Sequence, residues 1–249
     1  MSKNTYKYFI GIKIIISYIL CNLFLVINAQ ETKSLKPSHF LASLELSTKY
    51  MWRGIEYGTS PVLFPMLSYT NSGFNAYVMG GYATNGSHQE VDLGVSYTKD
   101  WLTVAVNDYY YPTAVGEQDR YFEFAKGKTG HSVEAAVTLA PEQLPLYMML
   151  SAYVYGNDKK LDGKQAYSSY VELGYVHNFT DDNTITVLAG ANLNKSFYTN
   201  YEKGFNVCNI TVKYSTALPF GKYKLPVSAS YVLNPYMEKS YFTLSLYLR

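Results

Sequence analysis

The sequence has few charges and very little cysteine. Charged residues make up 16% of its 249 positions, against roughly 25% in ordinary soluble domains. The formal net charge is +2 and no block of lysine or arginine stands out, so we expect no nucleic acid as a partner. Cys21 lies in a predicted leader, which leaves Cys208 alone and excludes a disulfide framework. We interpret Cys208 as an inert residue on the apolar face of a strand.

Motifs for catalysis and for metal binding are missing as well. There is no G-x-S-x-G elbow, no His/Cys/Asp/Glu spacing resembles a metal site, and we expect no cofactor. The enzyme hypothesis that is left would use His131 with Ser132 and Glu134. Because adjacent residues on a strand face opposite sides, these side chains make a poor catalytic set, and we expect that the protein is not an enzyme.

Long apolar runs are absent after the first 30 residues, and the mean hydropathy is −0.11, which excludes a helical membrane protein. At the start, Lys3, Lys7 and Lys13 precede an apolar run that ends near Asn28-Ala29. This pattern predicts a signal peptide over 1–29, cleaved after Ala29. An uncleaved anchor and a lipoprotein attached at Cys21 are the alternatives. Residues 30–40 are polar and are interpreted as a periplasmic tail.

Tyrosine is abundant, with 27 residues, and apolar residues alternate with polar ones. In Leu44–Gly54, Leu44, Leu46, Tyr50 and Trp52 share one face, and charged residues occupy the other. An apolar face ending in aromatics, opposite a polar face with both signs of charge, is typical of a transmembrane β-barrel strand. About a dozen further segments repeat the pattern, which predicts an all-β fold: an antiparallel transmembrane barrel over 41–249. A soluble β-sandwich is the main rival fold.

Loop lengths set the predicted strand count. The short joining segments alternate with longer polar ones, as in outer-membrane barrels, where short turns are periplasmic. This rule holds along the chain if Tyr121–Lys126 is an extracellular extension of the Ser132–Ala140 strand, which gives 12 strands; 10 and 14 are the alternatives. The first strand is expected to run to about Arg53, and the C-terminal strand to close onto it. The Tyr109–Tyr111 run is interpreted as part of an interfacial aromatic girdle, with a sugar-stacking or partner platform as the alternative.

Charged side chains on the inward face are the candidate pore-lining residues. Five are acidic and three are basic, which is too balanced to predict ion selectivity. In a narrow lumen such charges either line a channel or pair across it and plug it. Arg53 is expected at the outer rim, paired with a neighbouring carboxylate. The predicted pore-lining residues are Glu45, Lys49, Arg53, Glu90, Asp92, Glu134, Glu172 and Lys213.

The segment S-T-K-Y-M-W-R-G-I-E-Y-G-T-S-P (Ser47–Pro61) resembles the Y-x-W-R-G opening of the TorF-type porins. Two further pieces, S-Y-T-N-S-G-F-N-A-Y-V (Ser68–Val78) and Y-F-E-F-A-K-G (Tyr121–Gly127), are similar to segments of the same family. The resemblance implies a pore-like protein of the Gram-negative outer membrane, and it carries over no binding residues.

We therefore expect an outer-membrane porin-like channel for passive diffusion of small solutes or ions. A non-conducting barrel with a binding or structural role is the alternative, and a barrel enzyme comes third. The expected partners are outer-membrane lipid, small solutes and, during biogenesis, the barrel-assembly machinery and periplasmic chaperones.

Overall fold

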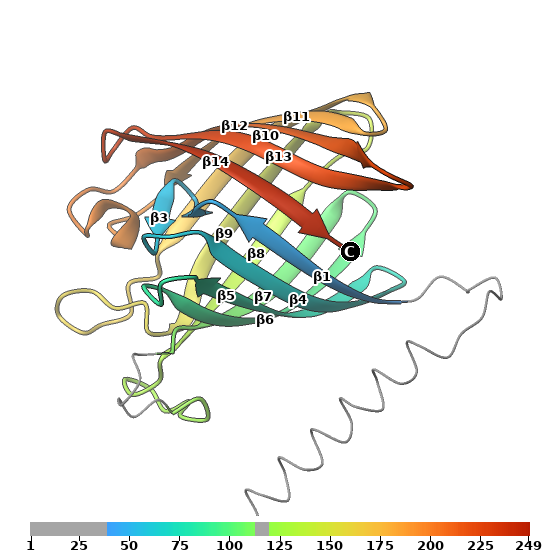
Figure 1. The fold of residues 1–249 in the computed structure, drawn as a ribbon. Helices are drawn as coiled ribbons and strands as arrows, with labels where there is room; N and C mark the ends of the chain where they lie inside the picture. Colours follow the sequence, from blue (N-terminus) through green and yellow to red (C-terminus); the bar gives the residue numbers. More distant parts are fainter. Residues whose placement is uncertain (1–38, 113–119) are drawn as a thin grey trace, which may run out of the picture. The chain divides into compact units, whose positions relative to one another are not determined.

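The computed structural model describes residues 39–112 and 120–249. Within these residues twelve antiparallel strands close into one barrel, in the order β1-β14-β13-β12-β11-β10-β9-β8-β7-β6-β5-β4 (Figure 1). The predicted signal peptide, and the tail as far as residue 38, lie outside the described residues. In the described part, no helix is long and apolar enough to cross a membrane. The barrel strands are β1 (Phe40–Ser47), β4 (Val62–Asn71), β5 (Phe74–Ala83), β6 (Gln89–Lys99), β7 (Leu102–Tyr110), β8 (His131–Leu139), β9 (Leu146–Gly156), β10 (Ser169–Thr180), β11 (Asn183–Asn192), β12 (Asn206–Phe220), β13 (Tyr223–Asn234) and β14 (Lys239–Leu248).

The barrel closes between its first and last strands, as predicted. β1 pairs with β14 from Leu44↔Leu248 to Ser47↔Ser245, while its other edge pairs with β4 over all eight residues. Thr48 extends the β14 seam, because its backbone N–H donates to the carbonyl of Leu244. Closure satisfies the backbone groups that an open sheet edge would leave unpaired, which is the condition for spanning a lipid bilayer with strands.

Strand connections of two lengths separate the two ends of the barrel. The connections β4–β5, β6–β7, β8–β9, β10–β11 and β12–β13 are short turns and lie at one end, which we call the turn end. The opposite end, called the loop end, carries the four longest connections, β1–β4, β7–β8, β9–β10 and β11–β12, together with the short β5–β6 and β13–β14 connections. The predicted count of 12 strands is therefore confirmed, and the predicted alternation of loop lengths holds except at the short β5–β6 and β13–β14 connections.

The outer surface of the barrel is apolar. On β7, Val104 and Val106 are 45% and 47% exposed, and their neighbours on β8 and β9 are similarly open. Exposed aromatic side chains such as Trp101, Phe179 and Phe220 gather at or beside the short turns. An exposed apolar wall bordered by aromatic residues needs lipid rather than water as its solvent. The molecule is thus a transmembrane β-barrel.

On the inner wall, tyrosine rings lie directly over glycine residues of the neighbouring strand. Tyr147 and Gly174 are partners in the β9–β10 register, and a Cβ on Gly174 would lie 2.0 Å from the Tyr147 ring. Tyr77 and Gly94 make the same arrangement between β5 and β6, at 2.1 Å. A larger residue at either glycine would displace the ring into the lumen.

Two sequence predictions about strand limits are wrong. β1 ends at Ser47 rather than near Arg53, and a separate hairpin follows, formed by β2 (Tyr50–Trp52) and β3 (Ile55–Tyr57). The Tyr121–Lys126 segment is not an extension of the next strand: it consists of turns, and β8 begins at His131. In both places the sequence alternates like a strand, but the backbone leaves the wall of the barrel.

Candidate functional site

The β2–β3 hairpin occupies the lumen, and its turn is tight. Arg53 and Gly54 both have positive φ, at 49° and 82°, which is the conformation of the primed turns that match the twist of a two-stranded hairpin. A Cβ on Gly54 would lie 1.9 Å from the carbonyl oxygen of Cys208. The Asn234 side chain donates to the Gly54 carbonyl at 3.1 Å. The tip of the hairpin is therefore in close contact with the inner sides of β12 and β13.

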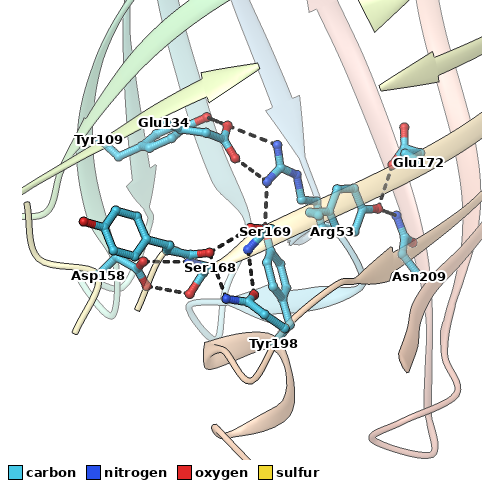
Figure 2. A network of polar contacts seen from close by, with 12 residues as sticks. Arg53, Tyr109, Glu134, Asp158, Ser168, Ser169, Glu172, Tyr198 and Asn209 are labelled. Carbon is cyan, nitrogen blue, oxygen red and sulfur yellow. Dashed lines mark hydrogen bonds and ion pairs between the residues drawn. The ribbon is translucent and has the colours of Figure 1, made fainter. Parts of the chain in front are cut away.

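Arg53 joins this hairpin to the wall of the barrel. Its guanidinium donates to both carboxylate oxygens of Glu134 on β8, at 2.6 Å and 3.1 Å (Figure 2). It also donates to the hydroxyl of Tyr198 at 2.7 Å. The Arg53 and Glu134 side chains are only 7% and 1% exposed. A charge this deeply buried persists only when it is paired and fully hydrogen-bonded, and the bidentate geometry meets that condition.

Aromatic rings enclose the ion pair. The Arg53 guanidinium lies 4.6 Å from the ring centroids of both Trp52 and Tyr170, within the range of cation–π attraction. The Tyr109 hydroxyl donates to Glu134 at 3.0 Å. The carboxylate therefore accepts three hydrogen bonds, and the rings exclude water from around it.

A second inserted segment packs beside the hairpin in the lumen. The short 3-10 helix η1 (Phe197–Thr199) in the β11–β12 connection places Tyr198 inside the barrel, with no solvent exposure. The Tyr198 ring stacks on Tyr170 at a centroid distance of 5.4 Å. Burial raises the pKa of Tyr198, although the Arg53 cation opposes this effect, so its hydroxyl stays neutral and accepts from Arg53. We call the β2–β3 hairpin and η1 together the plug.

Cys208 belongs to the plug contacts rather than to the lipid face. A register shift in β12 opposite Gly190 and Ala191 changes the side to which its side chain points. The thiol is fully buried in a cluster with Tyr170 and Tyr198. The prediction that Cys208 lies on the apolar outer face is wrong, because period-2 parity does not register a bulge.

Two cavities lie on either side of the plug. The inner cavity, of about 390 Å³, is lined by mid-strand residues that include Glu45, Glu172 and Thr211. The outer cavity, of about 400 Å³, lies among loop-end residues. Both fall in the size range of small-molecule pockets. The outer cavity is lined by Tyr57, His88, Tyr111, Ser132, Tyr153, Asn157, Asp158, Phe197 and Tyr201.

The lining of the outer cavity is mainly aromatic and neutral. Burial raises the pKa of Tyr57 to about 12 and that of Tyr111 still further, with the Glu90 carboxylate as the next cause for both. These hydroxyls are therefore protonated at physiological pH. Asp158 faces its own loop: its carboxylate accepts from the backbone N–H of Ser168 at 2.8 Å and from the Ser168 hydroxyl at 2.5 Å (Figure 2).

The predicted pore-lining residues divide into three groups. Arg53 and Glu134 form the buried pair, so Arg53 lies at the hairpin tip and not at the outer rim. Lys49 pairs with Glu56 at the base of the hairpin, and Lys213 donates to the Tyr247 hydroxyl at 3.3 Å. The other predicted residues are carboxylates without a lysine or arginine within ion-pair distance in the described part of the chain: Glu45, Glu90, Asp92 and Glu172.

Hydrogen bonds hold two of these carboxylates. Glu172 accepts from the hydroxyls of Tyr147 and Tyr170, both at 2.7 Å. Glu90, 1% exposed, lies 3.1 Å from Nε2 of His88. Asp92 is equally buried, and its Oδ1 has no hydrogen-bond partner among the described residues.

The three tyrosines at the end of β7, Tyr109 to Tyr111, lie in three different environments. Tyr109 lies in the lumen against Glu134, Tyr110 packs on His131, and Tyr111 lines the outer cavity. The girdle interpretation of Tyr109–Tyr111 is therefore wrong.

Sequence reasoning also missed Tyr170 and Tyr198. Tyr170 had a usable signal, because its parity matches that of Glu172, but Tyr198 sits in a loop where no periodicity applies.

His131 lies on the opposite face of β8 from Ser132 and Glu134, the other two residues of the enzyme hypothesis. His131 contacts Asp108 and Tyr121 at the outer wall, Ser132 lines the outer cavity, and Glu134 is paired with Arg53. Across residues 39–112 and 120–249, no group of three or more His, Cys, Asp or Glu side chains could hold a metal ion.

Comparisons with known proteins give structural likeness alone. No family model matches the chain, and no curated protein matches it. One similar solved structure comes from work on the in-meso crystallisation of membrane proteins; it has a TM-score of 0.48 and 9% identity, over 84% of this chain and 83% of the other. Another, a bacterial polysaccharide outer membrane secretin, has a TM-score of 0.33 and 10% identity, over 86% and 100% of the two chains. At these values the barrel assignment depends on the strand pairing and the apolar outer wall described above.

Proposed function

We propose that this chain is a porin-like channel of the Gram-negative outer membrane, closed in this structure by the plug. Short turns at one end, longer loops at the other and the apolar wall support that location. The observation that carries the proposal is the Arg53–Glu134 pair: the lumen is obstructed by a hairpin attached to the wall, with a cavity on each side. The Y-M-W-R-G piece that resembles TorF-type porins is the same hairpin.

The charges that line the lumen favour cations as the permeant ions. Arg53 neutralises Glu134 and Lys49 neutralises Glu56, which leaves the half-buried Glu45 and Glu172 against Lys213. Glu90 and Asp92 are left out of this balance, because both are 1% exposed and neither has a lysine or arginine partner among the described residues. An excess of carboxylates along a narrow pore attracts cations and repels anions. Displacement of the hairpin would free one cation and one carboxylate together, so the excess of carboxylates would persist in the open state.

A second function, a non-conducting barrel that binds a small molecule, is supported by the outer cavity. Five aromatic rings line that cavity, it opens at the loop end, and the plug forms its floor. Such a lining suits a neutral ligand, because the Asp158 carboxylate is already occupied by Ser168. In this alternative the plug is a permanent structural support.

Conductance of the protein in a planar bilayer separates these functions. The test compares the native protein with a variant in which a short Gly-Ser linker replaces Lys49–Gly58. We expect rare, brief openings from the native protein, and steady steps that favour K⁺ over Cl⁻ from the variant. The matched control shortens the exposed Lys160–Lys164 segment of the β9–β10 loop and should behave as the native protein does. Silence from both proteins, with intact insertion, would leave the non-conducting barrel. Equal conductance from both would eliminate the plug as a gate.

A further inference from the structure

The connection that leads into β8 packs on the outside of the barrel. We call Arg120–Gly130 the wall loop. In the β7–β8 register Tyr110 pairs with His131, and in the β8–β9 register Val133 pairs with Tyr155. Glu134 is in the lumen, so the odd-numbered β8 residues and their partners face outward. Although it faces outward, His131 has no solvent exposure, because the wall loop covers it.

Specific contacts fasten the wall loop to that outward surface. The His131 ring lies between Asp108 and the loop, with Nδ1 2.7 Å from Oδ2 of Asp108 and Nε2 2.6 Å from the carbonyl oxygen of Tyr121. The Phe124 ring stacks on His131 at 4.5 Å between centroids. The Tyr155 hydroxyl donates to the Phe124 carbonyl at 2.5 Å. The loop therefore has a defined position against the wall.

The wall loop presents apolar rings and cations to its surroundings. Phe122 is 86% exposed and Phe124 is 51% exposed. Three basic side chains on the same loop, Arg120, Lys126 and Lys128, are also exposed. Glu123 is the one acidic residue of the loop, and its carboxylate accepts from the Ala125 backbone N–H at 2.9 Å. Within residues 120–130 the loop thus carries three exposed cations, one carboxylate and two open aromatic rings; Glu117 and Asp119 of the same connection lie outside the described residues.

The depth of the wall loop matches the outer boundary of the apolar belt. The nine residues of β7 run from Leu102 at the turn end to Tyr110 under the loop. At ~3.3 Å per residue and a strand tilt of about 40°, this corresponds to roughly 20 Å along the barrel axis, against an apolar belt about 25 Å tall. Counted from Leu102, the end of β7 under the wall loop therefore lies just inside the outer edge of such a belt, so the loop itself is close to the level where headgroups begin.

We infer that the wall loop binds the phosphorylated headgroup of an outer-leaflet glycolipid of the lipid A type. Phe122 and Phe124 lie at the boundary with the acyl chains, while Arg120, Lys126 and Lys128 contact the phosphates. Aromatic rings prefer that boundary, and clustered basic residues attract anionic headgroups. A phosphate accepts several hydrogen bonds from such cations at once. This inference is independent of whether the lumen conducts.

Native mass spectrometry of the full chain in detergent, titrated with diphosphorylated lipid A, tests the inference. The variant carries Arg120→Gln, Lys126→Gln and Lys128→Gln. The control carries the same loss of charge on other loops of the loop end, as Lys160→Gln, Lys164→Gln and Lys203→Gln. We expect the variant to bind at least tenfold more weakly than the native chain, and the control to stay within twofold of it. A Phe122→Ser variant should lose affinity for lipid A while its fold and net charge are unchanged.

Three results would overturn the inference. The first is equal binding by the native chain and the triple variant. The second is equal retention of lipid A from which the phosphates have been removed, since phosphate recognition is the basis of the site. The third is that phosphatidylglycerol binds as tightly as lipid A, because a general attraction for anionic lipids would then explain the data without a glycolipid site.

Discussion

The β2–β3 hairpin and the wall loop are both insertions at the loop end, and they treat charge in opposite ways. In the hairpin, one cation is buried in the lumen and is satisfied by the protein alone, through Glu134 and Tyr198. On the wall loop, three cations are exposed, and His131 beneath them provides the attachment. The environment explains the difference: a charge away from solvent needs a fixed partner, whereas a charge at an interface can find partners in water or headgroups.

Breaking the buried ion pair should have the largest effect. Glu134→Ala leaves Arg53 without its carboxylate in a site that water does not reach, which typically costs about 3–5 kcal/mol. The measurement is urea-induced unfolding of the barrel in lipid vesicles, for Glu134→Ala, Arg53→Ala and the double variant. We expect the double variant to lose less than the sum of the two single losses, because it removes both members of the pair.

The matched change on the outer wall is Lys126→Ala, which removes an exposed cation that has no partner carboxylate among the described residues. It should change the unfolding free energy by about 0.5 kcal/mol or less. Additive losses in the Arg53 and Glu134 cycle, or a loss from Lys126→Ala as large as that from Glu134→Ala, would contradict the comparison.

Two glycines give the second test, because both have positive φ but different surroundings. Gly54 has φ of 82° and lies on the backbone of Cys208, whereas Gly127 has φ of 80° and would place a Cβ in open space. Gly127→Ala therefore carries the backbone penalty alone, about 1 kcal/mol. Gly54→Ala adds a collision with a carbonyl oxygen and should displace the hairpin.

Maleimide labelling of Cys208 reports this displacement directly, because the thiol is buried under the plug. We expect slow labelling in the native protein and in Gly127→Ala, and clearly faster labelling in Gly54→Ala. If the thiol stays protected in Gly54→Ala while the barrel remains folded, the hairpin tolerates the added Cβ. The close approach of Gly54 to the Cys208 carbonyl would then not determine the position of the hairpin.

The barrel was predictable from the sequence because most of its strands carry their own alternation of apolar and polar residues. Leu44 and Leu46 face lipid and alternate with Glu45, and similar alternation in most strands shows which side faces lipid; β4, with Val62 and Phe64 on its lumen side, is an exception. The plug was not predictable in the same way. Tyr50 and Trp52 continue the alternation of β1, so the sequence did not show that the strand ends at Ser47. The positive-φ turn at Arg53-Gly54 was the available sign, since glycine there favours a tight hairpin.

Non-local contacts explain the remaining errors. The pairing of Arg53 with Glu134 joins residues 81 positions apart, and no local pattern specifies it. The bulge at Cys208 changes the parity without a marker in the sequence. Phe122 and Phe124 alternate as a strand would, yet Tyr121 is held on the outer wall by His131. Parity arguments hold within a strand and fail where the chain leaves the wall.

The most local expected effect concerns the attachment of the wall loop. His131→Phe keeps a ring against Phe124 but removes both polar contacts of the imidazole, to Asp108 and to the Tyr121 carbonyl. A hydrogen bond to a charged group such as the Asp108 carboxylate is worth about 1.5–3 kcal/mol, but the loop remains covalently tethered and packed by its rings, so we expect a local loosening worth about 1–2 kcal/mol. In vesicles, trypsin cleavage after Lys126 and Lys128 should rise about tenfold, with the barrel intact.

The control is His177→Phe, which changes an exposed residue near the turn end and should leave cleavage unchanged. Unchanged cleavage in His131→Phe would mean that ring packing alone holds the loop, and the parallel with Arg53 as a polar attachment point would fail.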